Sequence, residues 1–289
     1  MTLHANDAAL DVDMDMDVVD FAPARRRFAP SAAEPPARLQ AAPPQPTVSL
    51  VVPTMNEERN IGWLLERLPD GLHEVILVDG RSKDATVEVA RRLRPDIRVV
   101  LEPRPGKGVA LRAGFAAAEG DYVVMIDADG SMDPSEIGRF VEALDAGCDF
   151  VKGSRFAPGG GSTDISVIRQ LGNEALMTAV NVLYRTEFSD LCYGYIGFRR
   201  DKLAVLRLQS DGFEIETEMI TRAVTAGLSI GEVPSFESER IHGTSNLNAW
   251  RDGRRALKTL LQGRVVLPQT PVVVSGVAQP QVAVASTAA

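Results

Sequence analysis

Residues 121–134 read DYVVMIDADGSMDP, a stretch that indicates the fold. The five residues 122–126 are all apolar, and two aspartates, Asp127 and Asp129, follow almost directly. A short apolar run of this kind is typical of a strand that is covered on both faces, as in a parallel sheet between two layers of helices. We therefore predict a buried strand over 121–127 with two carboxylates at its carboxyl end.

The same pattern repeats on both sides of this stretch. Further strands are predicted at Thr47–Pro53, Glu74–Asp79, Ile97–Leu101 and Phe150–Lys152. Helical spacing predicts helices at Glu57–Leu68, Asp84–Leu93, Lys107–Ala118 and Pro134–Ala146. This alternation predicts an α/β fold with a mostly parallel, Rossmann-like sheet and right-handed crossovers. Ligands of such sheets bind beyond the carboxyl ends of the strands, which selects Pro53–Glu57, Asp79–Ser82 and Asp127–Asp133.

The composition is that of a soluble globular protein. Of the 289 residues, 45% are apolar and 24% are charged, and the formal net charge is -8. No long block of Lys and Arg occurs, which argues against nucleic-acid binding. Cys148 and Cys192 lack a CxxC spacing, so we expect free thiols and no zinc site. The sequence contains no long apolar run and no signal-peptide pattern, and a cytoplasmic location is expected.

Both ends of the chain differ from this central part. Residues 1–46 are rich in aspartate and proline and are predicted to be a disordered leader. Its basic cluster, Arg25–Arg27, is expected to be solvated, with contact to acidic lipid head groups as the alternative. Residues 263–289 are expected to form a flexible tail, which leaves 47–262 as the folded domain.

Asp127 and Asp129 are candidate metal ligands. Two carboxylates separated by one residue in a turn can converge on a hard cation such as Mg²⁺ or Mn²⁺, which readily takes its other ligands from a diphosphate. The alternative is an ordinary turn, in which an aspartate caps the helix that begins near Pro134. The position of the pair at the end of a buried strand favours the metal site.

The other strand ends also carry polar groups. Asp79 can accept hydrogen bonds from a base or a ribose, although a simple turn also explains an aspartate there. Pro53–Glu57 ends the first strand in the same way. Arg104–Gly108 reads RPGKG, a basic and glycine-rich helix entry that suits phosphate, with a plain turn as the alternative.

Four ordered motifs resemble those of the family 2 glycosyltransferases. They are PTMNEERNI from Pro53, ILVDGRSKDAT from Ile76, GKGVALRAGFAAAEGDYVVMIDADGSMDP from Gly106 and VKGSRF from Val151. The resemblance covers about Val48 to Leu260 and is closest to the branch of dolichyl-phosphate mannose synthases and bacterial polyprenyl-phosphate sugar synthases. It implies a GT-A fold, with a nucleotide-sugar-binding half at 47–155 and an acceptor-binding half at 156–262.

The resemblance also implies roles for individual residues. The donor would be held by Pro53, Asn56, Glu57, Asp79, Lys107, Asp127 and Arg240. Asp127 and Asp129 would bind Mg²⁺ or Mn²⁺, and Asp129 would take part in catalysis. Arg155, in GSRF, matches the family's phosphate-binding arginine and would also take part in catalysis. Arg169 would be a second contact to the acceptor phosphate.

Glu216 is the candidate catalytic base. It stands in Phe213–Glu218, where the family's catalytic acidic residue often lies, ahead of a helix that runs to about Ala226. In an inverting transfer a base takes the acceptor's proton while a metal steadies the departing diphosphate. A lipid phosphate is already ionised, in which case Glu216 would only orient the acceptor. The alternative is a solvated helix start, where carboxylates favour the helix dipole.

Residues 240–246 resemble the R-x-x-G-x-S-K loop of the polyprenyl-phosphate branch. Arg240, Gly243 and Ser245 match, whereas Asn246 stands where lysine is usual. Ser131 likewise replaces a glutamine that often follows the metal motif. His242, within this polar loop, is a candidate metal or diphosphate ligand, with a structural role as the alternative.

These features predict a metal-dependent, inverting transfer of a hexose from a UDP- or GDP-sugar to a polyprenyl phosphate. Since no anchor is apparent, we expect peripheral contact with the inner face of the membrane through the basic, amphipathic segment Trp250–Leu261. The alternatives are a soluble transferase that acts on a saccharide or small-molecule hydroxyl, which Asn246 and Glu216 favour, and a non-catalytic nucleotide-sugar-binding protein. A nucleotidyltransferase would carry a glycine-rich triphosphate loop where PTMNEE stands.

Overall fold

The computed structural model describes residues 45–245, 247–262 and 273–275. Of the expected leader, 1–46, only the last two residues fall within these ranges. Most of the expected tail also lies outside the described residues. Its described part, Val273–Ser275, forms a short strand.

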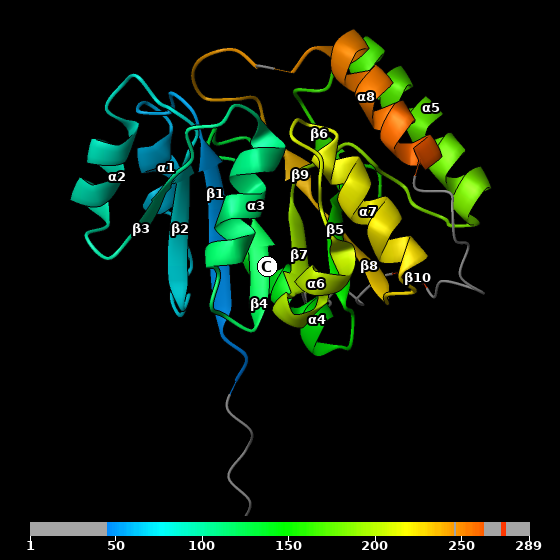
Figure 1. Cartoon of the computed structure of the whole chain (residues 1–289), viewed down its shortest axis with the longest axis horizontal. Helices are drawn as coiled ribbons and strands as arrows, with labels where there is room; N and C mark the ends of the chain where they lie inside the picture. The colour runs from blue at the N-terminus through cyan, green and yellow to red at the C-terminus, as the bar shows by residue number, and fades with distance from the viewer. Residues whose placement is uncertain (1–44, 246, 263–272, 276–289) are drawn as a thin grey trace, which may run out of the picture. The chain divides into compact units, whose positions relative to one another are not determined.

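Within the described residues, eight strands form one sheet, in the order β10-β8-β5-β7-β4-β1-β2-β3 (Figure 1). Their bounds are β1 Val48–Thr54, β2 Glu74–Asp79, β3 Arg98–Leu101, β4 Tyr122–Met125, β5 Phe150–Ser154, β7 Ile196–Arg199, β8 Ile230–Pro234 and β10 Val273–Ser275. Neighbours pair in parallel except at β7, which is antiparallel to both β4 and β5. A second, two-stranded sheet joins β6, Gly161–Ser162, to β9, Phe236–Glu237. The mostly parallel sheet that the sequence predicted is confirmed.

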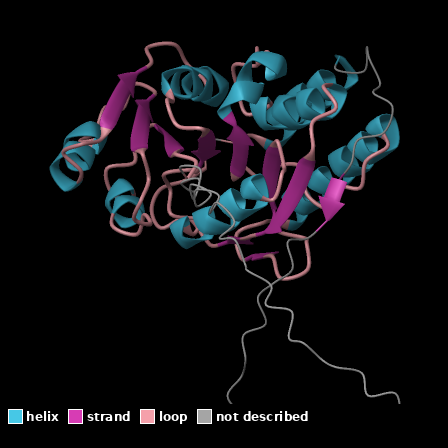
Figure 2. Ribbon diagram, turned by 90° about the horizontal axis from the view of Figure 1, so that it is seen from below, coloured by secondary structure: helices cyan, strands magenta, loops and turns pink. Residues whose placement is uncertain are grey.

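Helices cover both faces of the large sheet (Figure 2). They are α1 Ile61–Leu65, α2 Thr86–Leu93, α3 Lys107–Ala117, α4 Ile137–Asp145, α5 Val167–Tyr184, α6 Leu203–Leu206, α7 Ile215–Thr225 and α8 Ala249–Gln262, with 3-10 turns η1 Pro134–Glu136 and η2 Arg200–Lys202. One apolar core contains side chains of α3, α5 and α7, and the other contains side chains of α1, α2 and α4. The large sheet therefore lies between two layers of helices.

The strands are apolar at successive positions because alternate side chains enter different cores. On β1, Val51 belongs to the core beneath α3, whereas Leu50 and Val52 belong to the core beneath α1 and α2. Successive side chains of a strand point to opposite faces, so a sheet that is covered on both faces needs apolar residues at every position.

One predicted helix, Glu57–Leu68, is wrong in its bounds, since α1 covers only Ile61–Leu65. The Glu57 backbone carbonyl accepts hydrogen bonds from the amides of Asn60 and Ile61, so the chain turns here before the helix begins. The Asn60 side chain donates to the Glu57 carboxylate at 2.6 Å. Residues 57–60 therefore form a hydrogen-bonded turn where the sequence predicted the start of a helix.

The register brings the polar strand ends to one edge of the sheet. Thr54 of β1 pairs with Asp79 of β2, and Val51 pairs with Met125 of β4. The carboxyl ends of these parallel strands therefore lie side by side, where ligands of open α/β sheets bind. In the part of the chain that the structure describes, no helix has the length and apolar character needed to cross a membrane.

Candidate active site

Asp127 and Asp129 follow β4 in a tight turn, and each carboxylate is bonded to a cation. Lys107 Nζ lies 2.8 Å from Asp127 Oδ1, and Arg240 Nη2 lies 2.8 Å from Asp129 Oδ2. Asp129 Oδ1 also accepts hydrogen bonds from the amide and hydroxyl of Ser131, at 3.0 and 2.7 Å. The helix that follows is capped by Asp133, which accepts from the Ser135 amide at 2.9 Å. The aspartate that caps this helix is therefore Asp133, and metal binding by Asp127 and Asp129 remains a prediction.

Lys107 connects this turn to Glu216. Lys107 and Glu216 are 109 residues apart in the sequence. Lys107 is the first residue of α3, and its Nζ lies 2.8 Å from Oε1 of Glu216, which is near the start of α7. The side chains of Lys107 and Glu216 are only 10% and 12% exposed. One ammonium group therefore bridges the candidate metal ligand Asp127 and the candidate base, and Glu216 does not stand on a solvated helix start.

Burial governs the electrostatics of this cluster. It raises the pKa of Asp127 to about 6, because Asp129 and Glu216 add to the effect and Lys107 only partly opposes it. Burial acts to lower the pKa of Lys107, but the charges of Asp127 and Glu216 outweigh it and leave the pKa above its ordinary value. Lys107 is therefore a permanent cation in the site.

The sequence suggested that the glycine-rich helix entry suits a phosphate, but the Gly108 amide of this entry is bonded within the protein. The Gly108 amide donates to the Asp211 carbonyl oxygen at 2.9 Å. Gly106 has φ of +122°, and a Cβ at that position would collide with the same oxygen. The glycines thus permit close packing against the Asp211 backbone, and within this turn it is the Lys107 side chain that reaches the site.

The expected base and ribose contacts lie together at the ends of β1 and β2. Asp79 is buried, and its carboxylate accepts from the Ser82 amide at 3.2 Å. Asn56 adopts φ of +61°, and its side-chain oxygen accepts from the Lys83 amide at 2.8 Å. Pro53 is half-buried at the end of β1. A short polar side chain is the kind that tolerates this left-handed backbone, and it ties the two strand ends together.

The loop after β9 folds over the Asp127–Asp129 turn. Arg240 Nη1 lies 2.8 Å from Glu57 Oε1, and Nη2 contacts Asp129. Arg240 therefore links the segment after β1 to the segment after β4. The Ile241 amide donates to the Asp129 carbonyl oxygen at 3.2 Å. The backbone oxygen of His242 accepts from the Asn60 side chain at 3.0 Å. Asn246 lies outside the described residues.

The donor set at the turn fits a hard divalent cation in part. Asp127 and Asp129 supply carboxylate oxygens, the ligands that Mg²⁺ and Mn²⁺ prefer. Among the described residues, no group of three or more His, Cys, Asp or Glu side chains is placed to hold a metal ion. Two carboxylates would therefore need diphosphate or water oxygens to complete the coordination, and His242 as a third ligand remains a prediction.

Arg155, which the sequence suggested as a phosphate-binding residue, is buried and paired with two carboxylates, and phosphate binding by Arg155 remains a prediction. Its side chain is 2% exposed, with Nε 2.7 Å from Asp190 Oδ2 and Nη1 3.0 Å from Glu237 Oε2. Its Nη2 also donates to the Cys192 carbonyl oxygen at 3.0 Å. Arg155 therefore ties the end of β5 to the segment before β7 and to β9. The sequence contains no local signal for Asp190 or Glu237, which are 35 and 82 residues away.

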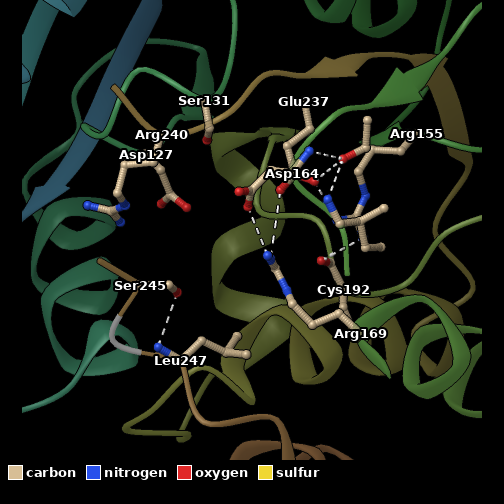
Figure 3. A network of polar contacts seen from close by, with 12 residues as sticks. Asp127, Ser131, Arg155, Asp164, Arg169, Cys192, Glu237, Arg240, Ser245 and Leu247 are labelled. Carbon is tan, nitrogen blue, oxygen red and sulfur yellow. Dashed lines mark hydrogen bonds and ion pairs between the residues drawn. The ribbon is translucent and has the colours of Figure 1, made fainter. Parts of the chain in front are cut away.

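Arg169 lies in the first turn of α5 and is more accessible. Its side chain is 29% exposed, with Nη1 2.8 Å from Asp164 Oδ2 and Nη2 3.9 Å from Glu237 Oε1. Figure 3 shows both arginines directed toward Glu237, with Arg169 on the side of Ser245 and Leu247. Arg169 is therefore more accessible to solvent than Arg155, and its contact with an acceptor phosphate remains a prediction.

A groove of about 510 Å³ lies between α5 and α8, and Glu216 is among the residues that line it. Its apolar walls include Ile168, Leu171 and Leu176 of α5 and Trp250, Ala256 and Leu257 of α8. Arg155, Arg169 and Cys192 also line it. Sequence reasoning singled out Trp250–Leu261 as amphipathic but missed the contribution of α5, because only the packing of the two helices creates the groove. This groove reaches the cluster that holds Asp127.

Comparison with known proteins agrees with this geometry. Residues 49–207 match the family model "Glycosyl transferase family 2". Glycosyltransferase AglJ of Haloferax volcanii is 32% identical over 217 residues, which cover 73% of this chain and 70% of that protein. An uncharacterized glycosyltransferase of Mycobacterium tuberculosis is 32% identical over 201 residues, covering 70% and 89%.

The fold also matches solved structures. Glucosyl-3-phosphoglycerate synthase from Mycobacterium tuberculosis, in complex with Mn²⁺, UDP and glucosyl-3-phosphoglycerate, superposes with a TM-score of 0.61 at 26% identity and covers 78% of this chain and 82% of its own. The same enzyme with Mn²⁺, UDP-glucose and glycerol 3-phosphate gives a TM-score of 0.61 at 25% identity. The chain belongs to glycosyl transferase family 2 and is a glycosyltransferase with the GT-A fold.

Proposed function

We propose that this enzyme transfers a hexose from a UDP- or GDP-sugar to a polyprenyl phosphate, with Mg²⁺ or Mn²⁺ bound at Asp127 and Asp129. The observation that carries the proposal is the apolar groove between α5 and α8, which Glu216 and Arg169 also line. A polar acceptor would leave these apolar walls exposed to water, whereas an isoprenoid chain would bury them. The phosphate at the end of the chain would then lie beside the donor site.

The donor half of the proposal rests on the carboxyl ends of β1, β2 and β4. Pro53, Asn56 and Asp79 would contact the base and ribose, and the diphosphate would lie at the Asp127–Asp129 turn. A divalent cation there would neutralise the departing diphosphate. Lys107 and Arg240 already contact the two aspartates, so both cations are within reach of the diphosphate oxygens. A Mn²⁺ ion and UDP bound together in the synthase from Mycobacterium tuberculosis support this assignment.

In the proposed reaction an oxygen of the acceptor phosphate forms a bond to the anomeric carbon of the sugar. The bond from that carbon to the β-phosphate oxygen breaks, and the nucleoside diphosphate leaves with the electron pair. An ionised phosphate needs no base, and Glu216 would then hold Lys107 and orient the acceptor. A singly protonated phosphate would pass its proton to Glu216, which lines the groove.

Exposed apolar side chains beside the groove support peripheral membrane contact at the cytoplasmic face. On α5 these are Val167, Ile168 and Leu171, and on α8 they are Trp250, Leu257 and Leu261. Trp250 is 81% exposed. Four cations of α8, Arg251, Arg254, Arg255 and Lys258, accompany them. An amphipathic surface of this kind fits the boundary between lipid head groups and acyl chains.

Filling the groove tests the lipid acceptor. Gly172 of α5 lines the groove, and a Cβ added there meets no heavy atom of the described residues within 4 Å outside its immediate helix backbone. Gly172→Leu should therefore narrow the groove without a clash. Gly138→Leu on α4 is the matched control, because Gly138 has the same open surroundings but does not line the groove. Replacing a helical glycine also favours the helix by up to about 1 kcal/mol in both variants.

Transfer from UDP- and GDP-sugars to a polyprenyl phosphate would be measured with both variants. We expect at least a tenfold loss in Gly172→Leu, with nucleotide affinity unchanged and wild-type transfer in Gly138→Leu. Equal lipid transfer in the two variants would contradict the proposed acceptor.

A phosphorylated small molecule is the second candidate acceptor. Complexes of the synthase from Mycobacterium tuberculosis with phosphoglyceric acid and with glycerol 3-phosphate favour it. The same assay with these two compounds distinguishes the candidates. A small acceptor should be used equally well by wild type and Gly172→Leu, since it does not need the apolar groove.

A further inference from the structure

Gly194 lies between two anchored tyrosines just before β7. The Tyr193 hydroxyl lies 2.9 Å from Ser235 Oγ, and the Tyr195 hydroxyl donates to the Asp133 carbonyl oxygen at 3.1 Å. Both rings are buried in the same apolar core. The backbone of Gly194 is thus held from both sides.

The side-chain position of residue 194 faces the catalytic cluster, away from that core. A Cβ added to Gly194 would lie 2.8 Å from Glu216 Oε1, 3.1 Å from Lys107 Nζ and 3.4 Å from Asp127 Oδ2. These three groups come from the starts of two different helices and from the end of β4. The three charged groups therefore pack against the backbone of Gly194, where a side chain would otherwise be.

We propose that Gly194 is a positioning residue, whose lack of a side chain lets Lys107, Asp127 and Glu216 converge in the geometry that transfer needs. This inference rests on the proposed function, which assigns the diphosphate to Asp127 and the acceptor to Glu216. The rate of a reaction falls steeply when the groups that act on it are misplaced. A side chain at residue 194 would therefore impair transfer by displacing Glu216, the group that it would approach most closely.

The cost of a methyl group at this position follows from the distances. A carbon at 2.8 Å from a carboxylate oxygen lies inside the van der Waals contact distance, so Glu216 would have to move away from Lys107 in Gly194→Ala. The backbone cannot easily retreat, because Tyr193 and Tyr195 are anchored. A displacement of about 1 Å in a catalytic constellation costs on the order of 100-fold in rate.

The test compares Gly194→Ala with Gly197→Ala. Gly197 lies three residues further along, in β7, where an added Cβ would meet its nearest neighbour, Phe140, at an ordinary 3.5 Å. For Gly194→Ala we expect kcat of sugar transfer to fall at least tenfold, with the Kd of the nucleoside diphosphate within twofold of wild type and an unchanged Tm. Gly197→Ala should match wild type in all three measurements.

A double variant separates crowding from general disruption. In Glu216→Asp the carboxylate retracts by one methylene, which leaves room for the methyl of Gly194→Ala. We therefore expect the double variant to lose less activity than the product of the two single losses, as coupled neighbours do. Independent, multiplicative losses would overturn the inference, as would wild-type kcat in Gly194→Ala or a weakened nucleotide Kd in that variant.

The wild-type protein separates this inference from the proposed function. Absence of wild-type transfer to a polyprenyl phosphate would count against the proposed acceptor. The ratio of kcat in Gly194→Ala to kcat in wild type, measured with whichever phosphate acceptor is used, would still decide the role of Gly194.

Discussion

Lys107→Met should tighten binding of Mn²⁺ to the nucleotide-free protein and yet impair transfer. Lys107 Nζ lies 2.8 Å from Asp127 Oδ1 and the same distance from Glu216 Oε1, in a pocket where its side chain is 10% exposed. It therefore occupies a carboxylate that we assign to the metal. Removal of its charge frees Asp127 for a cation but also removes a candidate contact to the diphosphate.

The magnitude follows from Coulomb's law. A metal ion lies about 2.1 Å from a carboxylate oxygen, so it would sit about 4 Å from the ammonium group on the same carboxylate. At an effective dielectric constant of about 20, two unit charges at this distance interact by about 4 kcal/mol, and a divalent ion feels twice as much. Easier protonation of Asp127, whose pKa burial already raises to about 6, offsets part of this gain.

After solvent screening we expect Mn²⁺ affinity to rise at least tenfold, which is about 1.4 kcal/mol. The rise would be measured by titration calorimetry without nucleotide, at a pH about two units above the pKa of Asp127, where little proton competition remains. Lys202→Met is the matched control, because Lys202 pairs with Asp149 at 3.4 Å and takes no part in the site. Unchanged or weaker Mn²⁺ binding in Lys107→Met would refute the idea that Lys107 competes with the metal.

Two further predictions concern the acceptor and the pH dependence of stability. Arg169→Met should raise KM for a phosphate acceptor at least tenfold and leave the Kd of the nucleoside diphosphate unchanged. The reason is that Arg169 lines the groove and not the donor site. Equal changes in KM and Kd would contradict this prediction. Burial raises the pKa of Glu136 above its ordinary 4.5, so folding favours the protonated form and this stabilisation is lost as pH rises through the raised pKa. Urea unfolding should therefore show that Glu136→Gln gains stability relative to wild type between pH 4.5 and neutrality, and a relative loss would show that the ion pair with Arg139 outweighs burial.

Local sequence signals predicted much of the fold. The strand over Glu74–Asp79 has the predicted bounds, because a β-branched apolar run between turn residues depends on little outside itself. The position of Asp127 and Asp129 at the end of a buried strand was predicted for the same reason. The predicted helix at Glu57–Leu68 was too long because Asn60 bonds Glu57 and the backbone of His242, a contact across 182 residues.

The roles of the charged residues were harder to predict. Arg155 has the sequence context of a phosphate-binding residue, yet its charge is matched by Asp190 and Glu237, which enter from distant segments. Lys107 was expected at a helix entry suited to phosphate, yet the adjacent amide of Gly108 bonds the Asp211 backbone. Ion pairing depends on which side chains are brought together, and no periodicity in the sequence records that.

The sequence by itself determined the alternation of strands and helices, the polar strand ends and the family, because strand and helix patterns and turn chemistry are properties of neighbouring residues. Only the tertiary structure decided that Lys107 bridges Asp127 and Glu216, that Gly194 faces all three, and that α5 and α8 enclose an apolar groove. These features arise from contacts between elements far apart in the chain. Such contacts are set by how whole helices and strands pack, and the order of the residues within each element does not specify them.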